Sequence, residues 1–360
     1  MRKASAPGES SLSRKRRITA PYAHELSEYA ARQTTRLNVP GHASDPEGRS
    51  ELHRFFGGDI LRKDVPPLLP GLDKGPGNAL ATAKQLAALA WRARRTWFLT
   101  NGASQANRMV GLALASFRAA ADPVVIQRSA HSSVMDGVIL ADLAPVFVMP
   151  TVDSSLGIAH GVSAAALAGA LRDVKDPKAV YITSPSYFGA VSDIRELARI
   201  AHAHGAALIV DGAWGSHFGF HPDLPENPLD CGADVVVTST HKLGGSLTQS
   251  AMLHVAETPH GRELEPLIDR ALSLTQSTSE SSLLLASLDL ARAELSAGGA
   301  LLSDSLAAAS ALRRQPASPS SSTWRATDSR ASPTWSTSTR CACRSRFRTI
   351  WTGTTPARRS

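Results

Sequence analysis

Short apolar runs rich in β-branched residues alternate along the chain with Ala- and Leu-rich segments that have helical spacing. The runs predict seven strands, over residues 97–100, 123–127, 145–149, 179–183, 207–210, 234–238 and 251–255. Between the strands the spacing predicts helices, for example over 104–120, 163–174 and 193–205. Strands joined by helix-length crossovers indicate an α/β fold with a mostly parallel seven-stranded sheet and helices on both faces.

Two places depart from this alternation. The strands predicted over 234–238 and 251–255 are separated by too little chain for a crossover helix, so we expect them to pair antiparallel. Residues 281–312 predict either one long amphipathic helix or two helices that are broken at Gly298 and Gly299.

The two ends of the chain differ in composition from the body. Residues 1–17 are rich in Ser, Lys and Arg and predict a disordered basic arm. Residues 313–360 have neither helical nor strand periodicity, yet they hold three of the six tryptophans. This segment is either out-of-frame translation of a GC-rich gene or a genuine disordered basic tail. The expected folded domain is therefore 18–312.

The positive charge also lies at the ends. The whole chain has a formal net charge of +8, but residues 313–360 carry ten arginines and one acidic residue, whereas 18–312 hold 23 basic and 29 acidic residues. We therefore expect no nucleic-acid partner. Three cysteines exclude a disulfide framework and a four-cysteine zinc site. With no span of membrane length and no apolar core of a secretory signal, we expect a cytoplasmic protein without a membrane partner.

A lysine follows one of the predicted buried strands in the stretch VVVTSTHKLGGSLTQS, residues 235–250. Lys242 at the end of a strand, facing a cleft, would lose its proton by desolvation and act as a nucleophile toward an aldehyde. Gly244 and Gly245 would allow a sharp turn and leave room for a flat ligand. On this motif alone, a surface lysine in a turn is an equal alternative.

A carboxylate lies in a similar position, where Asp211 ends the strand before the small residues Gly212 and Ala213. In open α/β sheets, ligands bind in the crevice outside the carboxyl ends of the strands. A carboxylate at this place would keep the ring nitrogen of a pyridoxal cofactor protonated. Taken alone, Asp211 is also a candidate helix-capping residue.

Two further motifs complete the set. The turn Gly102-Ala103-Ser104 lies between a predicted strand and a predicted helix, where the first N–H groups of the helix would bind a phosphate. His131, just after the strand at 123–127, would stack on a flat ring. The alternatives are an ordinary helix N-cap and a structural histidine.

One spacing resembles that of metal ligands, in the segment that contains His217, His221 and Asp223. Glycine at 215 and 219 and Pro222 disfavour a regular helix there, so the three side chains would not share one face. We expect no metal site.

With these motifs in this order, the chain resembles the Orn/Lys/Arg decarboxylases, pyridoxal-phosphate enzymes of fold type I with the aspartate aminotransferase-like fold. The resemblance covers residues 37–312. The matching stretches are VPGHASD, TNGASQANRMVGLAL, RSAHSSVMDG, VDGAWGSHFGFHP, TSTHKLGGSLTQSAMLHV and SSLLLASLDLAR.

The resemblance implies a role for each candidate residue. Pyridoxal phosphate would be attached to Lys242, with Asp211 at the ring nitrogen and His131 stacked on the ring. The implied phosphate ligands are Gly102, Ala103, Ser104, Ser239 and His241. The implied neighbours of the ring are Ala213 and Trp214. The implied reaction is decarboxylation of ornithine, lysine or arginine to a diamine or agmatine by a homodimer or higher homo-oligomer.

Three features depart from the family pattern. Ala43 stands where the family often has lysine, and Ala103 replaces a frequent hydroxyl residue. Residues 313–360 do not resemble the small C-terminal domain that closes over the cleft in the family. The alternatives are therefore an aminotransferase or lyase with the same cofactor, or a truncated inactive homologue.

Overall fold

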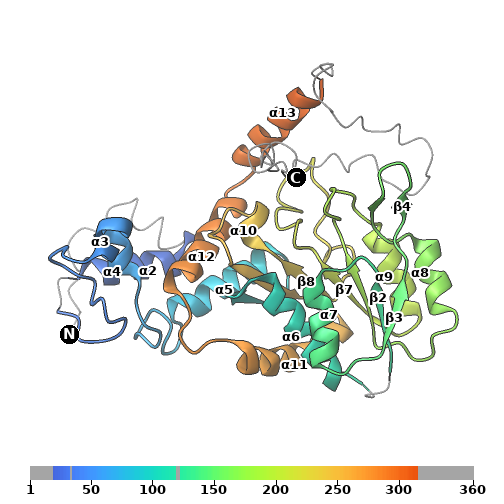
Figure 1. Ribbon diagram of the computed structural model, residues 1–360, viewed down its shortest axis with the longest axis horizontal. Helices are drawn as coiled ribbons and strands as arrows, with labels where there is room; N and C mark the ends of the chain where they lie inside the picture. Colours follow the sequence, from blue (N-terminus) through green and yellow to red (C-terminus); the bar gives the residue numbers. More distant parts are fainter. Residues whose placement is uncertain (1–18, 33–34, 119–121, 315–360) are drawn as a thin grey trace, which may run out of the picture.

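A computed structural model describes residues 19–32, 35–118 and 122–314 (Figure 1). The arm expected over 1–17 and the tail from 315 onward lie outside the described residues, so the model does not test either expectation. The last described helix ends at Arg314, two residues beyond the boundary that we expected at 312.

A seven-stranded sheet forms the centre of the fold, in the order β1-β9-β8-β7-β6-β2-β3. Its strands are β1 (Arg95–Leu99), β2 (Val124–Gln127), β3 (Pro145–Val148), β6 (Ala179–Thr183), β7 (Ala207–Asp211), β8 (Val235–Thr238) and β9 (Ala251–Val255). All seven predicted strands are confirmed, with ends that differ by two residues or fewer. A small hairpin of β4 (Val152–Asp153) and β5 (Ile158–Ala159) was not predicted.

Six of the seven strands run in one direction. β2, β3, β6, β7 and β8 pair parallel, whereas β9 is antiparallel to β8 and to β1. The expected antiparallel pair is therefore confirmed. Because β9 lies between β1 and β8 and opposes both, β1 ends at the same edge of the sheet as β8.

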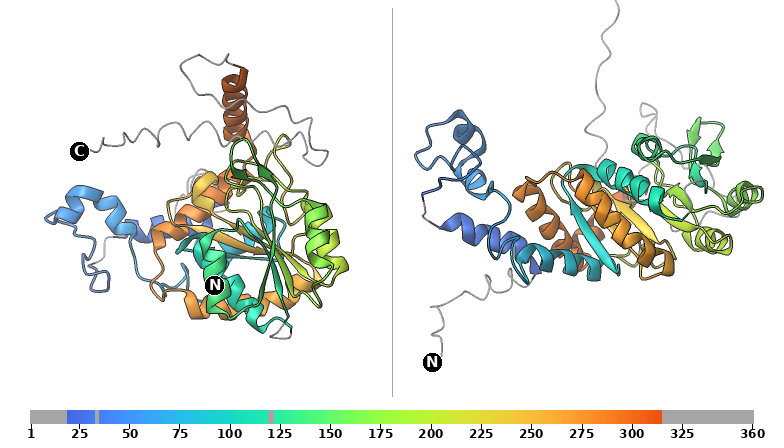
Figure 2. Two further views of the ribbon diagram at one scale, coloured as in Figure 1. Left: turned by 45° about the vertical axis from the view of Figure 1, so that its right-hand side comes forward. Right: turned by 90° about the horizontal axis from the view of Figure 1, so that it is seen from below.

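Helices cover both faces of the sheet (Figures 1 and 2). The described helices are α2 (Pro21–Ala31), α3 (Glu51–Phe56), α4 (Gly58–Lys63), α5 (Ala79–Ala90), α6 (Gly102–Ser116), α7 (Ser132–Leu140), α8 (Ala164–Leu171), α9 (Ile194–Ala203), α10 (Thr240–Leu243), α11 (Pro259–Thr275), α12 (Ser282–Ser296) and α13 (Ala300–Arg314). The core divides into two clusters: one joins the sheet to α2, α5, α8, α9 and α12, and the other joins it to α6, α7 and α11.

Strand β6 illustrates why the central strands are apolar throughout. Val180 and Ile182 belong to the first cluster, and Ala179 and Tyr181 belong to the second, because successive side chains point to opposite faces. Both faces are covered, so the strand has no solvated face to carry polar side chains.

A close contact between two glycines joins α6 to α7. A Cβ atom on Gly111 would lie 2.7 Å from the backbone of Gly137, and one on Gly137 would lie 3.0 Å from the carbonyl oxygen of Asn107. The helix backbones can approach this closely only because neither position has a side chain. The contact fixes the place of α7 beside α6.

The chain between α12 and α13 bends at the two glycines that we considered as a break. Gly298 and Gly299 have φ values of +88° and +29°, so the prediction of two helices is the correct one. α13 projects from the body in both views (Figures 1 and 2). Among the described residues, no single helix is long and apolar enough to cross a membrane. Helices α12 and α13 together have the length and composition of a membrane span, but the chain bends by 75° between them.

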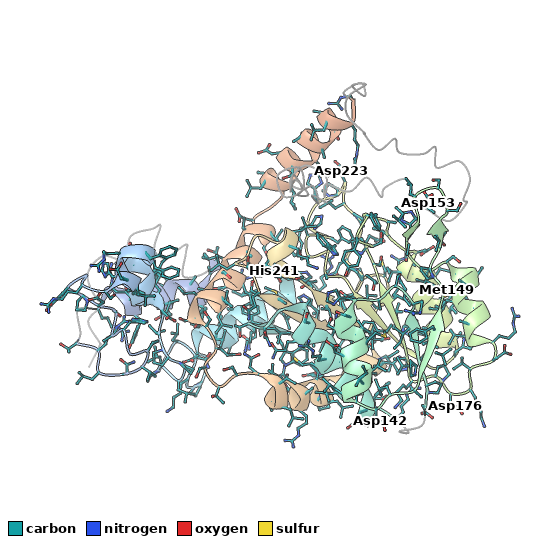
Figure 3. The ribbon with its side chains drawn as sticks, viewed as in Figure 1. Asp142, Met149, Asp153, Asp176, Asp223 and His241 are labelled. Carbon is teal, nitrogen blue, oxygen red and sulfur yellow. The ribbon has the colours of Figure 1, made fainter. Side chains whose placement is uncertain are left out.

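The two edges of the sheet can be followed in Figure 3. Asp142 and Asp176 precede β3 and β6 and lie at the lower edge, whereas His241 after β8 and Asp153 in the hairpin after β3 lie above them. The upper edge is therefore the carboxyl edge of the parallel strands, where we expected the ligand-binding residues.

Candidate active site

The predicted site residues come from four segments that begin at the carboxyl edge. Asp211 is the last residue of β7, and Ser239, His241 and Lys242 follow β8 directly. Gly102 follows β1, and His131 follows β2. Parallel strand order thus brings together residues that are as much as 140 positions apart in the sequence.

Asp211 is buried, with 2% of its surface exposed. Its two carboxylate oxygens accept hydrogen bonds from the backbone N–H of Ala213 (3.1 Å) and from the side-chain amide of Asn107 (3.1 Å). Burial raises the pKa of Asp211, whereas these hydrogen bonds and the charges of Lys242 and His131 lower it. Asp211 is the N-cap of none of the described helices, and its buried carboxylate is held by these two donors.

Lys242 lies in the short helix α10, half-buried, with Nζ 4.3 Å from the centre of the Trp214 ring. Burial lowers its pKa, and the negative charge of Asp211 partly opposes that change. A lysine in a solvated turn would not show such a shift. The arrangement favours the reactive amine over the surface lysine.

His131 is the N-cap of α7. Its Nδ1 atom accepts a hydrogen bond from the backbone N–H of Ser133 (3.2 Å) and lies 2.8 Å from the Ser133 hydroxyl. A backbone N–H can only donate, so Nδ1 is the acceptor and a neutral ring carries its proton on Nε2. His131 therefore has the structural role of a helix cap. The cap uses only Nδ1, so the ring faces and Nε2 remain able to contact a ligand.

The turn after β1 has the conformation expected of an anion site. Gly102 has φ +76°, which favours glycine, and α6 begins there. The side chain of Asn101, at the N-cap, makes no capping hydrogen bond. Ala103 and Ser104 in the first turn are half-buried. On the other side, His241 Nδ1 donates to the Ser250 carbonyl (2.9 Å) and lies 3.3 Å from the Ser239 hydroxyl.

Buried hydroxyls near these groups lack protein partners. The Thr183 and Thr240 hydroxyl oxygens have none among the residues that the structure describes. Thr183 pairs with Asp211 across β6 and β7, so it lies at the same edge of the sheet. Because an unpaired buried hydroxyl is costly, these atoms fit a site that a polar ligand completes.

Three residues of the site were missed by the sequence analysis. Asn107 in α6 contacts Asp211, Tyr181 in β6 donates to Asn107 (2.8 Å), and Ser133 in α7 accepts from Asn107 (2.9 Å). An amide among the apolar residues of a buried helix was a usable signal for Asn107. The other two have no signal in the sequence alone.

The spacing that resembled metal ligands does not bring its residues together. His217 is buried, and burial lowers its pKa to about 4, whereas His221 lies 3.9 Å from Asp223. A cavity of about 400 Å³ on the surface is lined by His221 and Arg92 among others, but by none of the predicted site residues. We therefore do not assign the chemistry to this cavity.

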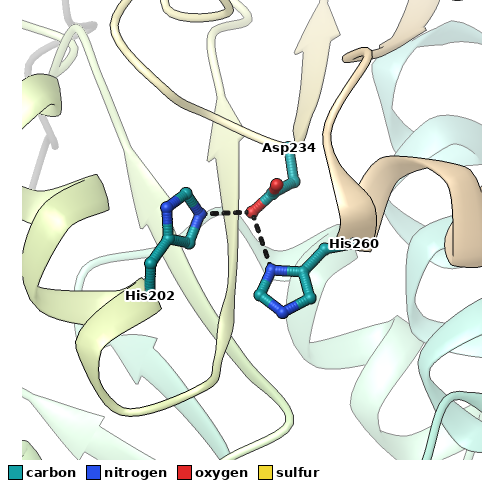
Figure 4. A group of neighbouring side chains, drawn as sticks. All are labelled: His202, Asp234 and His260. Atoms are coloured by element: carbon teal, nitrogen blue, oxygen red, sulfur yellow. Dashed lines mark hydrogen bonds and ion pairs between the residues drawn. The ribbon is translucent and has the colours of Figure 1, made fainter.

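A different trio converges at the opposite edge of the sheet, formed by His202, Asp234 and His260 (Figure 4). Asp234 accepts from His202 Nε2 (2.9 Å) and also from the Leu208 N–H (2.7 Å). The guanidinium of Arg118 donates to His260 Nε2 (2.9 Å), which leaves the His260 proton on Nδ1, facing Asp234. A metal ion would need that atom deprotonated, so the trio is a hydrogen-bonded hub.

Comparison with known proteins identifies the family. The family model for the major domain of the Orn/Lys/Arg decarboxylases matches residues 20–336. An arginine decarboxylase from Bacillus subtilis is 35% identical over 78% of this chain and 56% of its own length. The lysine decarboxylase LdcA from Pseudomonas aeruginosa is 26% identical over 82% of this chain and 43% of its own length. The chain thus spans about half the length of these curated relatives.

Solved structures give the fold. Lysine decarboxylase A from Pseudomonas aeruginosa has a TM-score of 0.71 at 26% identity, covering 84% of this chain and 43% of its own. A serine palmitoyltransferase from Sphingomonas wittichii has a TM-score of 0.52 at 17% identity, covering 73% and 59%. The expected fold, aspartate aminotransferase-like and of fold type I, is confirmed. The chain belongs to the Orn/Lys/Arg decarboxylase family.

Proposed function

We propose that the protein is a pyridoxal-phosphate-dependent decarboxylase that releases CO₂ from a basic amino acid. The observation that carries the proposal is that Lys242 and Asp211 follow neighbouring strands at the carboxyl edge of the sheet, near enough for the charge of each to influence the other. An amine with a lowered pKa and a buried carboxylate are the two groups that an aldehyde cofactor with a pyridine ring requires. Membership of the family is independent support.

The residues at the site fit the cofactor. The unpaired Thr183 hydroxyl beside Asp211 and the glycine turn at Gly102 are the structural observations that support this fit. Lys242 would hold the cofactor covalently. The phosphate would lie against Gly102, Ala103, Ser104, Ser239 and His241, and the ring against His131, Asp211, Ala213 and Trp214.

Each group of the protein then has a stated task. When bound, the cofactor supplies an electron-poor ring that accepts the electron pair left when CO₂ departs. Asp211 holds a proton at the ring nitrogen, and its burial strengthens that interaction. Burial lowers the pKa of Lys242, which favours uptake and return of a proton at Nζ, and the Trp214 ring stabilises the cationic form.

The substrate class is proposed from the relatives. The arginine decarboxylase from Bacillus subtilis, at 35% identity, is more similar to this chain than the lysine decarboxylase from Pseudomonas aeruginosa, at 26%. We therefore propose arginine as the first substrate to test, with lysine and ornithine beside it. The proposed assembly is a homodimer, because the segment with α3 and α4 exposes Phe55 (82%) and Leu37 (95%) outside the main body.

The experiment is product analysis with the purified full-length chain and added pyridoxal phosphate. Release of CO₂ from one of the three amino acids, with the matching amine detected by mass spectrometry, is the expected result. A Lys242→Ala variant should release none. Cofactor uptake without CO₂ release would favour the aminotransferase or lyase alternative, and neither uptake nor release would favour an inactive homologue.

A further inference from the structure

Asn107 lies at the centre of a hydrogen-bond network that joins four elements of the fold. It is 2% exposed and lies within α6, facing the sheet. Its side-chain amide contacts Asp211 of β7 (3.1 Å), Ser133 of α7 (2.9 Å) and Tyr181 of β6 (2.8 Å). A polar side chain this deep is costly unless each of its groups is paired, and here each of them is.

Chemistry fixes the orientation of the Asn107 amide. An ionised carboxylate only accepts hydrogen bonds, so the NH₂ group must face Asp211 and the carbonyl oxygen must accept from the Tyr181 hydroxyl. The second N–H of the amide then donates to the Ser133 oxygen. Every bond in the network therefore has a single direction.

The same direction continues to the histidine. Because Ser133 accepts from Asn107, its own hydroxyl proton is available for His131 Nδ1, 2.8 Å away. The Ser133 backbone N–H also donates to Nδ1 (3.2 Å). Two donors at Nδ1 keep the proton of a neutral ring on Nε2. One amide thus acts on both the Asp211 carboxylate and the His131 ring.

We propose that Asn107 is a positioning residue that holds Asp211 ionised and His131 with its proton on Nε2, so that both act on the cofactor as a unit. The inference rests on the proposed function for the cofactor, but the network itself belongs to the protein alone. A Cβ atom on Gly137 would lie only 3.0 Å from the Asn107 carbonyl oxygen, so α7 packs closely on the α6 backbone at this position. Both the side chain and the main chain of Asn107 are therefore held in place.

The first test needs no cofactor. In an Asn107→Asp variant, an acceptor oxygen faces Ser133, so the Ser133 hydroxyl turns toward position 107 and away from His131. We expect the ¹⁵N signal of His131 Nδ1 in the apoprotein to move, because this atom loses its hydroxyl donor and keeps only the Ser133 backbone N–H. The measurement is the ¹⁵N chemical shift of the ring, assigned with a His131→Gln variant. An unchanged His131 signal in Asn107→Asp would overturn the inference, whether or not the protein binds a cofactor.

The second test uses pyridoxal phosphate and absorbance. Asn107→Leu removes the N–H donors to Asp211 and Ser133. The midpoint of the pH titration of the visible absorption should therefore rise by about one pH unit in the loaded protein. The substitution should also weaken cofactor binding about tenfold. Tyr181→Phe keeps both donors and should give a smaller shift. Leu114→Ala, in the same helix and core cluster, lowers stability without touching the network and should leave the spectrum unchanged.

The outcomes separate the two proposals. A wild-type protein that takes up no cofactor contradicts the proposed function, while the histidine measurement still decides the role of Asn107. If Asn107→Leu does not fold, Asn107→Asp keeps the shape of the residue and places a like charge beside Asp211, so its shift should be larger. Equal spectra and equal cofactor affinities for wild type and Asn107→Asp would show that Asn107 only packs in the core and does not influence Asp211.

Discussion

The amine of Lys242 lies 4.3 Å from the centre of the Trp214 ring, and burial lowers its pKa. The lower pKa leaves more of the nucleophilic neutral amine at pH 7 to 9. We therefore expect formaldehyde with cyanoborohydride to methylate Lys242 at lower pH than the exposed Lys175, as followed by peptide mass spectrometry. Asp211→Asn removes the charge that opposes the shift, so the labelling of Lys242 should move to still lower pH. Equal pH profiles for the two lysines would contradict the prediction.

A pair of glycine substitutions tests the packing of α6 on α7. Gly111→Ala should destabilise the protein by about 1–3 kcal/mol, because its Cβ would meet the Gly137 backbone at 2.7 Å. The matched control is Gly169→Ala in α8, where no atom lies within 4 Å and the helix should gain about 0.5–1 kcal/mol. Urea denaturation measures both changes. A Gly111→Ala protein as stable as wild type would show that the contact is looser than described.

The hub at Asp234 gives a prediction on pH. Burial alone would raise the pKa of Asp234, but hydrogen bonds from His202, His260, Thr258 and Leu208 hold it well below its usual range. Its contribution to stability is therefore present above pH 3.8 and is lost as the pH falls below that value. The hydrogen bond to Asp234 raises the pKa of His202, so that contribution is complete below pH 6.5 and is lost as the pH rises through the higher folded value.

The free energy of unfolding of His202→Gln, measured from pH 4 to 9, tests the direction in which the His202 contribution to stability changes with pH. Its deficit relative to wild type should be largest near pH 5 and should shrink at alkaline pH. His204→Gln is the control, since that side chain bonds the Ile200 carbonyl instead. A loss of stability in His202→Gln that grows with rising pH would contradict the raised pKa of His202.

The departure of Ala103 from the family pattern can be tested directly. Ala103→Ser adds a hydroxyl in the first turn of α6, where the proposed phosphate would lie. A hydrogen bond to a charged group at this place should tighten binding of pyridoxal phosphate about tenfold, measured by fluorescence quenching. Gly102→Ala should weaken it, because φ +76° strains an alanine. Inorganic phosphate should compete with the cofactor in both variants.

The strands were predictable because their β-branched runs are short, apolar and bounded by helical segments, as in β6 and β8. The positions of Lys242 and Asp211 at strand ends were predictable for the same reason. The network of Asn107 was not, because it depends on β6 lying beside β7 and on α7 lying beside α6. Sequence spacing carries no information on that order.

The hub at Asp234 was missed for a similar reason. His202 lies in the last turn of α9, His260 lies in the first turn of α11, and Asp234 directly precedes β8. Only the folded chain places the three side chains at one point. The hairpin β4–β5 was missed because two-residue strands are too short for a periodicity to be read.

The reversed strand β9 sets a distance. It separates β1 from β8, so the turn at Gly102 and the segment of Lys242 start two strand spacings apart, about 10 Å. Backbone pairing keeps that interval constant, and loop sequences have little effect on it. β9 therefore fixes the separation between the Gly102 turn and the Lys242 segment, so a substitution in either loop should leave that separation unchanged.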